Sequence, residues 1–181
     1  VYEGLERPLV PVLAKMEMEG IKVDRDTLSR MSNAFAQKMA GLEAELHELA
    51  GKPFNVQSPA QVGQILFEDM GLEGGSKTKT GQWSTPADVL EDHATEHDFA
   101  ARVLDYRQLQ KLKSTYTDAL QDHINADTGR VHTSYIQSGA STGRLASTDP
   151  NLQNIPVRSE EGRRIREAFV AEPGNVLVSL D

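Results

Sequence analysis

Two long stretches of the chain repeat apolar residues at steps of three and four, the spacing of one face of an α-helix. The first begins at Asp24 or Asp26 and runs to about Ala50, and the second runs from Asp98 to Ile124. Their apolar positions are Leu28, Met31, Phe35, Met39, Leu42, Leu46 and Leu49, then Phe99, Val103, Tyr106, Leu109, Leu112, Tyr116, Leu120 and Ile124. Because each stripe needs an apolar partner, we predict that the two helices pack as an antiparallel arm.

The segment between the two stripes, residues 52–95, carries start signals for two shorter helices. Ser58 is followed by a proline and, three positions later, by Gln61, which is typical of a capped helix start. Thr85 and Asp88 repeat this arrangement around a second proline. We therefore predict a small helical insertion in the arm, with Ser58 and Thr85 as its caps.

The flanks of the arm are shorter and more mixed. Residues 8–19 have helical spacing, and a second helix is expected over residues 160–168. Residues 131–138 alternate apolar and polar side chains, and residues 176–180 are almost uniformly apolar, so both predict strands. We expect an α+β fold, mainly α, in which the helical arm is rooted on an incomplete antiparallel sheet.

Domain boundaries follow from these elements. We expect a first helix and link over residues 1–23, the arm with its insertion over 24–126, and the opening of a sheet-bearing subdomain over 127–181. Val1 is not methionine, and the last residue reads as the beginning of a motif. We therefore expect a piece of a longer protein.

Composition narrows the class of protein. The net charge is −8, there is no cysteine, and no apolar run approaches the length of a membrane span. Acids concentrate in residues 41–73, whereas residues 107–117 and 158–166 are basic. Binding of nucleic acid depends on local positive potential, so this segregation predicts a basic contact face and an acidic back.

The segment from Gly139 to Asp181 is the richest in candidate chemistry. Its first half is polar and turn-rich, with backbone angles fixed at Pro150 and Pro156. It offers side chains that donate hydrogen bonds, namely Arg144, Asn151, Gln153 and Asn154. An apolar strand that ends in a carboxylate, with a basic loop upstream, predicts a metal and a phosphate-bearing substrate.

Residues 141–158, STGRLASTDPNLQNIPVR, resemble the signature of family-A DNA polymerases of the bacterial polymerase I type. The tail around Asp181 resembles the start of that family's motif A, whose aspartate binds both catalytic metals. Residues 77–81 (KTKTG) and 110–116 (QKLKSTY) resemble the family's thumb subdomain. Trp83 departs from the family's pattern, which has a small residue or proline there. The resemblance extends over essentially the whole chain.

The resemblance implies the thumb and the start of the palm of a template-directed DNA polymerase. Such an enzyme uses deoxynucleoside triphosphates and two Mg²⁺ ions, and its partner is a primer–template duplex. We expect a monomer in the bacterial cytoplasm, on the nucleoid, without membrane attachment. In the family, the second metal-binding carboxylate and the helix that grips the nucleotide lie beyond these residues. We therefore expect the chain alone to be inactive.

The same resemblance assigns roles to individual residues. Asp181 is the expected catalytic metal ligand, and Arg158 is expected to organise the region of the nucleotide phosphates. Arg144 corresponds to an arginine that reaches the minor groove at the primer terminus, where hydrogen-bond acceptors are alike in all base pairs. The other expected DNA contacts are Asn55, Gln57, Ser58, Lys77, Thr78, Lys79, Thr80, Lys113, Ser114, Thr115, Asn151, Gln153 and Asn154.

Other interpretations compete with this one. Residues 139–143 (GASTG) match the nucleophile elbow of serine hydrolases, but no histidine follows them, as that triad order requires. His93 and His97 match an inverted zinc-peptidase pattern, yet they fall at an expected helix junction without a further ligand. A non-catalytic helical DNA-binding or adaptor module would explain the two long helices while leaving the signature as coincidence.

Overall fold

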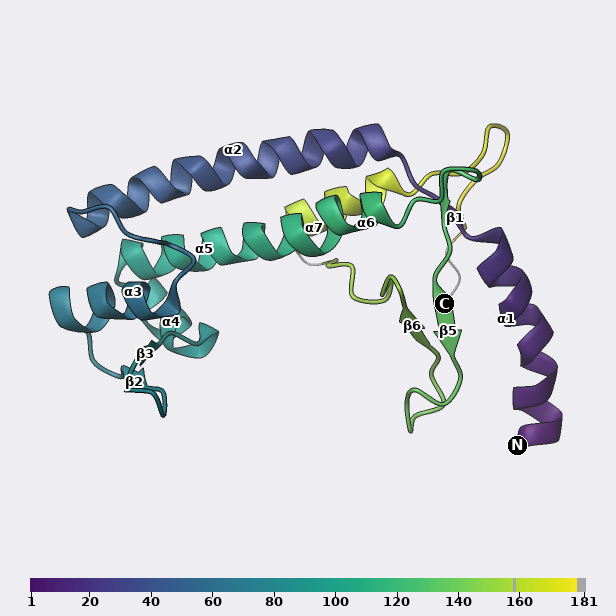
Figure 1. Ribbon diagram of the computed structural model, residues 1–181, viewed down its shortest axis with the longest axis horizontal. Helices are drawn as coiled ribbons and strands as arrows, with labels where there is room; N and C mark the ends of the chain where they lie inside the picture. Colours follow the sequence, from purple (N-terminus) through teal and green to yellow (C-terminus); the bar gives the residue numbers. More distant parts are fainter. Residues whose placement is uncertain (158, 179–181) are drawn as a thin grey trace. The chain divides into compact units, whose positions relative to one another are not determined.

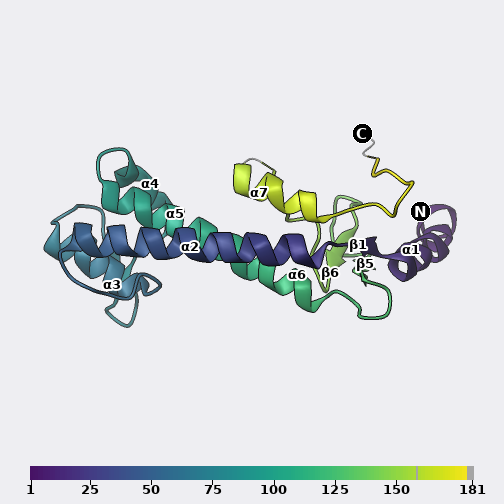
Figure 2. The ribbon, with the colours of Figure 1, turned by 90° about the horizontal axis from the view of Figure 1, so that it is seen from above.

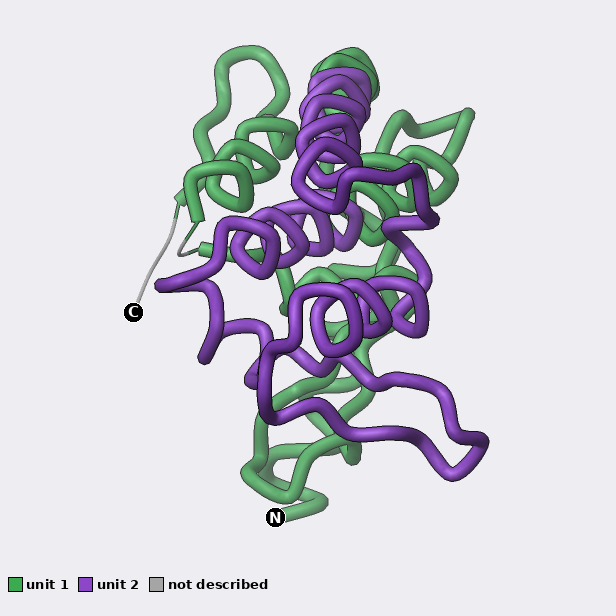
Figure 3. The backbone as a smooth tube through the Cα atoms, turned by 90° about the vertical axis from the view of Figure 1, so that its left-hand side faces the viewer, with its two compact units in different colours: residues 1–32, 112–181 green, residues 33–111 purple. Residues whose placement is uncertain are grey.

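The computed structural model describes residues 1–157 and 159–178. The chain divides into two compact units, residues 1–32 with 112–181 (unit 1) and residues 33–111 (unit 2), coloured separately in Figure 3. Long helices and three small antiparallel sheets make up the described residues, which confirms the predicted α+β, mainly α class. Among the described residues, no helix combines the length and apolar character needed to span a bilayer.

The two predicted long helices are present and pair in antiparallel directions. They are α2 (Arg25–Ala50) and α5 (Asp98–Leu112), the latter continuing through the π-helical turn η3 (Lys113–Asp118) into α6 (Ala119–Asp122) (Figures 1 and 2). In unit 2, the Arg102 guanidinium lies 2.8 Å from the Glu45 carboxylate. In unit 1, the Ser29 hydroxyl donates to the Gln121 side chain over 2.8 Å.

Unit 2 has its own apolar core. α2 and α5 contribute Leu46, Phe99, Ala100, Val103 and Tyr106, and the insertion contributes Val56, Val62, Ile65, Leu66 and Leu90. Burial of these side chains is the main stabilising term for a unit of this size. The apolar stripes recognised in the sequence are therefore core faces, except at Leu49, which is 43% exposed.

The insertion comprises α3 (Pro59–Gly63), the π-helical η2 (Gln64–Asp69) and α4 (Ala87–Ala94), with a hairpin of β2 (Ser76–Lys77) and β3 (Trp83–Ser84) between them. Ser58 caps α3 as predicted, because its hydroxyl accepts from the Gln61 N–H. The predicted cap at Thr85 is wrong. Pro86 precedes α4, and the Thr85 hydroxyl instead accepts a hydrogen bond from Arg107.

Unit 1 begins with η1 (Tyr2–Glu6) and α1 (Arg7–Glu19). The short strand β1 (Ile21–Lys22) pairs with β4 (Arg130–Val131), and β5 (Ser134–Ile136) pairs with β6 (Ala146–Thr148), both antiparallel. The first helix ends as predicted at Gly20, which has a φ of 64°. Later in the chain, α7 (Glu160–Ile165) and η4 (Arg166–Ala168) form the predicted terminal helix, which buries Ile165 and Ala168.

Two strand predictions need correction. The strand expected over 131–138 is divided into β4 and β5, because the intervening His132 and Thr133 use their side chains to bond α1 and the loop after β6. The strand expected over 176–180 is absent from its described part. Val176, Leu177 and Val178 are exposed and unpaired in the described backbone, so no neighbouring strand buries them there.

Candidate nucleic-acid interface

The β2–β3 hairpin presents the predicted lysine and hydroxyl cluster on an exposed turn. The Thr78 N–H donates to the Gln82 carbonyl over 2.7 Å, and the Gly81 N–H donates to the Thr78 carbonyl over 2.8 Å. The hydroxyls of Thr78 and Thr80 lie 2.8 Å apart. Residues 77–81 thus form a hydrogen-bonded turn, with Lys77, Thr78, Lys79 and Thr80 all exposed.

Trp83 packs at the base of this hairpin. Its ring centroid lies 5.0 Å from that of Phe67, and its indole N–H donates to the Glu68 carboxylate over 2.7 Å. The Lys77 ammonium lies 4.4 Å from the centroid of the Trp83 ring and 3.9 Å from the Glu68 carboxylate. Lys77 therefore has two local partners, whereas Lys79 extends into solvent with no partner among the described residues.

The turn before α3 brings Asn55, Gln57 and Ser58 together. The Asn55 carboxamide oxygen accepts from the Gln57 N–H over 2.9 Å, and the Gln61 side chain accepts from the Asn55 N–H over 2.8 Å. Gln57 also reaches the hydroxyl of Tyr106, at 3.3 Å. These bonds stabilise the turn, and the exposed side of Gln57 is the part that remains open to a ligand.

Arg107 is basic but faces inward. Its guanidinium donates to the Thr85 carbonyl over 2.5 Å and to the Thr85 hydroxyl over 2.6 Å. Burial lowers the pKa of Arg107 from its usual value. This arginine, counted in the basic stretch of the sequence, fixes the end of the hairpin and is not part of an exposed basic face.

Lys113, Ser114 and Thr115 lie on η3, the π-helical turn of unit 1. The Lys113 ammonium donates to the Asp118 carboxylate over 2.6 Å, and the Ser32 hydroxyl donates to the same carboxylate over 2.5 Å. Burial acts to raise the pKa of Asp118, but these two hydrogen bonds and the Lys113 charge lower it below its ordinary value. Lys113 is therefore partly neutralised, and Thr115 is exposed.

The loop between β5 and β6 carries Arg144, which is exposed and has no hydrogen bond or ion pair to the residues the structure describes. Gln153, which lies after β6, differs because both ends of its carboxamide bond backbone groups at the start of that strand. Its oxygen accepts from the Ser147 N–H over 3.2 Å, and its nitrogen donates to the Leu145 carbonyl over 2.7 Å. The Asn151 side chain accepts from the Gln153 N–H over 2.9 Å, while Asn154 is exposed.

Two buried groups that were not identified from the sequence stabilise β6 and the segment after it. The Thr133 hydroxyl bonds the Ser147 hydroxyl over 2.6 Å and donates to the Pro150 carbonyl over 2.8 Å. The Tyr116 hydroxyl donates to the Asn154 carbonyl. Both are buried polar groups that need a partner. A threonine in an alternating strand and a tyrosine in a helical stripe carry no sequence signal for such pairing.

Two expected site residues, Arg158 and Asp181, lie outside the described residues. Within residues 1–157 and 159–178, no three His, Asp or Glu side chains gather closely enough to hold a metal ion. His93 and His97 contact each other at 5.9 Å between ring centroids, and His93 bonds the Glu73 carbonyl.

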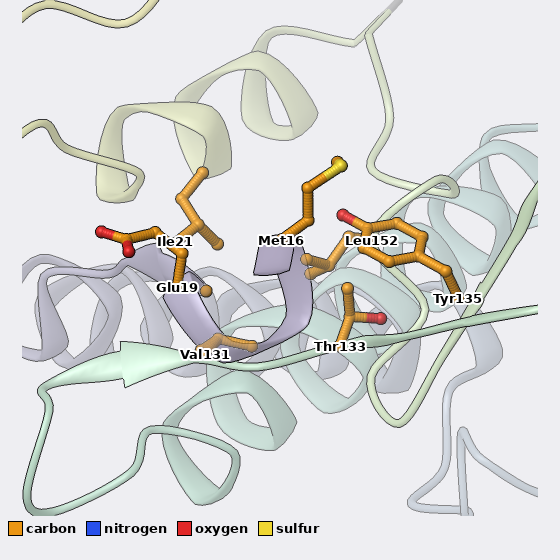
Figure 4. Close-up of a pocket in the computed structure, with 8 residues that line it drawn as sticks. Met16, Glu19, Ile21, Val131, Thr133, Tyr135 and Leu152 are labelled. Carbon is orange, nitrogen blue, oxygen red and sulfur yellow. The ribbon is translucent and has the colours of Figure 1, made fainter. Parts of the chain in front are cut away.

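A cavity of about 300 Å³ in unit 1 is lined mainly by apolar side chains. Figure 4 shows Met16, Ile21, Val131, Tyr135 and Leu152 around it, with Glu19 at its rim. Thr133 and Tyr135 add hydroxyls to its wall, and the Thr133 hydroxyl is bonded to that of Ser147. The exposed polar turns of each unit, and not this cavity, are the candidate binding surfaces.

Comparisons with known proteins identify relatives of this chain. The family model for DNA polymerase family A matches residues 25–181. A DNA polymerase I of Rhizobium leguminosarum is 59% identical over the whole of this chain, and the thermostable DNA polymerase I of Thermus aquaticus is 50% identical. The chain spans 18% and 22% of their lengths.

A solved structure is similar as well. It is the POL domain of Pol1 from M. smegmatis in complex with DNA primer-template and dNTP. The TM-score is 0.83 with 41% sequence identity, and the match covers 94% of this chain and 30% of that one.

Proposed function

The chain belongs to DNA polymerase family A, and we propose on that basis that it forms the thumb and the start of the palm of a template-directed DNA polymerase. The observation that carries the proposal is the close structural similarity to a polymerase domain described with primer-template and dNTP. We assign residues 24–126 to the thumb and 127–181 to the opening of the palm. The primer–template duplex and dNTPs are the proposed partners of a monomeric enzyme.

The proposed role of the thumb residues is to contact the phosphate backbone. Exposed lysines and hydroxyls at the hairpin turn suit phosphate oxygens, which are the same at every base pair. The net charge of −8 does not oppose this role, since a basic turn acts locally within a Debye length of about 8–10 Å. Binding should therefore be indifferent to sequence and sensitive to salt.

Arg144 is the proposed contact at the primer terminus. Its exposed guanidinium extends from the loop between β5 and β6, whose Leu145 carbonyl accepts a hydrogen bond from the Gln153 side chain. A guanidinium that donates to minor-groove acceptors tests the shape of a base pair without identifying the base. This role requires a side chain that is free to meet the duplex, and Arg144 has no hydrogen bond or ion pair to the residues the structure describes.

The proposed reaction is nucleotidyl transfer from a dNTP to a primer 3′-hydroxyl. Two Mg²⁺ ions would supply activation of the attacking oxygen and stabilisation of the leaving group. Asp181 would bind them and Arg158 would support the nucleotide phosphates. A single carboxylate cannot hold two metals, so the chain by itself should be inactive. We further propose a bacterial cytoplasmic location on the nucleoid, in line with the bacterial relatives.

The test is binding of a fluorescent primer–template duplex across a salt series, with Arg144→Ala and a Lys77→Ala/Lys79→Ala double variant. We expect sequence-independent binding whose salt slope falls by about 2 in the double variant, because each lost phosphate contact removes about 1. Arg144→Ala should weaken binding to a primer end more than to blunt duplex. Absence of salt-dependent binding by the folded chain would contradict the proposal and favour a non-DNA adaptor.

A further inference from the structure

Four residues, which we define as the Trp83 cluster, join the hairpin to η2: Phe67, Glu68, Lys77 and Trp83. The indole uses its ring against Phe67, its N–H on Glu68 and a face under the Lys77 ammonium. No other tryptophan occurs in the chain. Lys77 is thus the one lysine of the exposed turn whose charge is held by an aromatic ring in the described structure.

The support beneath Trp83 is rigid. A side chain at Gly63 would overlap the Cβ of Trp83, so α3 and β3 are in direct contact there. Two residues further on, Thr85 is buried and doubly bonded by Arg107. β3 is therefore held by α3 at Trp83 and by Arg107 at Thr85, just after the strand. An ammonium that contacts the indole is held at a defined position.

The two partners of Lys77 differ in what an approaching phosphate would do to them. The Lys77–Glu68 pair is long, at 3.9 Å, and both side chains are about half exposed, so water and salt weaken it. A phosphate can replace this carboxylate. The ring, by contrast, attracts the ammonium from one face and leaves the opposite side free to donate hydrogen bonds.

We infer that Trp83 is a positioning residue for duplex binding, because its indole holds the Lys77 ammonium at the hairpin base for a backbone phosphate that displaces Glu68. The inference rests on the proposed function. It makes Glu68 a competing anion. It also distinguishes Lys77, which is held in place, from Lys79, which samples solvent at the tip of the same turn.

The first experiment uses the free chain. NMR of the Lys77 side chain should show upfield-shifted ε-methylene protons from the ring current of Trp83, lost in Trp83→Leu and retained in Glu68→Gln. Glutamine keeps an acceptor for the indole N–H and removes the charge. Lys77 protons at the shift of an exposed lysine would overturn the inference whatever the chain binds.

The second experiment is a double-mutant cycle on duplex binding, with salt slope as the readout. Trp83→Leu should lower the slope by up to about 1 when Lys77 is present, and should have little further effect in Lys77→Ala. The matched comparison is Lys79→Ala, whose effect should add to that of Trp83→Leu. Additive effects of Trp83→Leu and Lys77→Ala would overturn the inference, because they mean that Trp83 supports the whole hairpin.

Glu68→Gln should change duplex affinity in the opposite direction to Trp83→Leu. We expect duplex affinity to rise about two- to threefold at low salt, as expected when a weak competing ion pair is removed. Unchanged or weaker binding would contradict the competing role of Glu68. Failure of the proposed function is distinguishable, because then the unmodified chain itself shows no salt-dependent affinity for duplex.

Discussion

The hydroxyl of Tyr116, a residue of the π-helical turn η3, donates a hydrogen bond to the backbone carbonyl of Asn154. Burial raises the pKa of Tyr116, so the phenol remains protonated and can donate throughout the neutral range. This bond ties η3, with its exposed hydroxyls, to the segment that follows β6. Within unit 1, one hydrogen bond thereby joins two segments that are 38 positions apart in sequence.

Removing the Tyr116 hydroxyl should loosen the segment after β6. We expect Tyr116→Phe to lower the free energy of unfolding by about 1 kcal/mol, the usual net value of one hydrogen bond. Thermal or urea unfolding measures the loss. Tyr2→Phe, at a residue that is 66% exposed, is the matched control and should leave stability unchanged. Equal effects of the two changes would show that the Tyr116 bond carries no net stability.

Asp118 should give stability a dependence on pH. Its pKa is depressed in the folded chain, so the contribution is present above the unfolded value and is lost as pH falls through the folded value, below about 3.8. Asp118→Asn should therefore be less stable than the unmodified chain at pH 7 and approach it in acid. Urea unfolding between pH 2.5 and pH 7 measures the difference.

Lys113→Met provides a second readout of the same ion pair. It removes the strongest partner of Asp118. It should therefore reduce the loss of unfolding free energy in acid, a loss that Asp118→Asn abolishes. A loss that keeps its full size in Lys113→Met would assign the depressed pKa to Ser32 alone.

Arg107 should matter far more for stability than a surface arginine. Arg107→Met removes two short hydrogen bonds to Thr85 and leaves a buried hydroxyl unpaired, so we expect a loss of about 2–3 kcal/mol. Arg102 is the control, since its ion pair with Glu45 is about half exposed and should contribute below about 1 kcal/mol. Chemical denaturation of both variants measures the two losses. Similar losses would contradict the inward role of Arg107.

Two glycines of unit 2 should respond oppositely to alanine. At Gly63 the new methyl group meets Trp83 and Thr85, so we expect a loss of about 1–3 kcal/mol from overpacking. At Gly41, in the middle of α2, an added Cβ would meet no atom within 4 Å outside its own helix backbone and chain neighbours, and alanine should stabilise by about 0.5–1 kcal/mol through helix propensity. Melting temperatures should move in opposite directions. A stabilising Gly63→Ala would mean that the Trp83 contact is easily displaced.

Much of the architecture was readable from the sequence because it depends on local patterns. The stripes from Leu28 onward and from Phe99 onward predicted both long helices, since a helix repeats its apolar face every 3.6 residues. The cap at Ser58 was predicted for the same reason, as its partner is only three positions away. Family membership was also evident, because the signature around Arg144 is contiguous.

Only the tertiary structure decided which polar side chains are free to meet a ligand. Arg107 and Gln153 read as donors for a partner but are taken up by Thr85 and by the loop backbone. The Lys77 ammonium lies over the Trp83 ring, whereas the Arg144 side chain is exposed. These outcomes depend on contacts beyond a single helical turn, from six positions away at Trp83 to 22 positions away at Thr85. A helix or cap is determined by neighbours within one turn, while the availability of a charge is determined by whatever the fold packs against it.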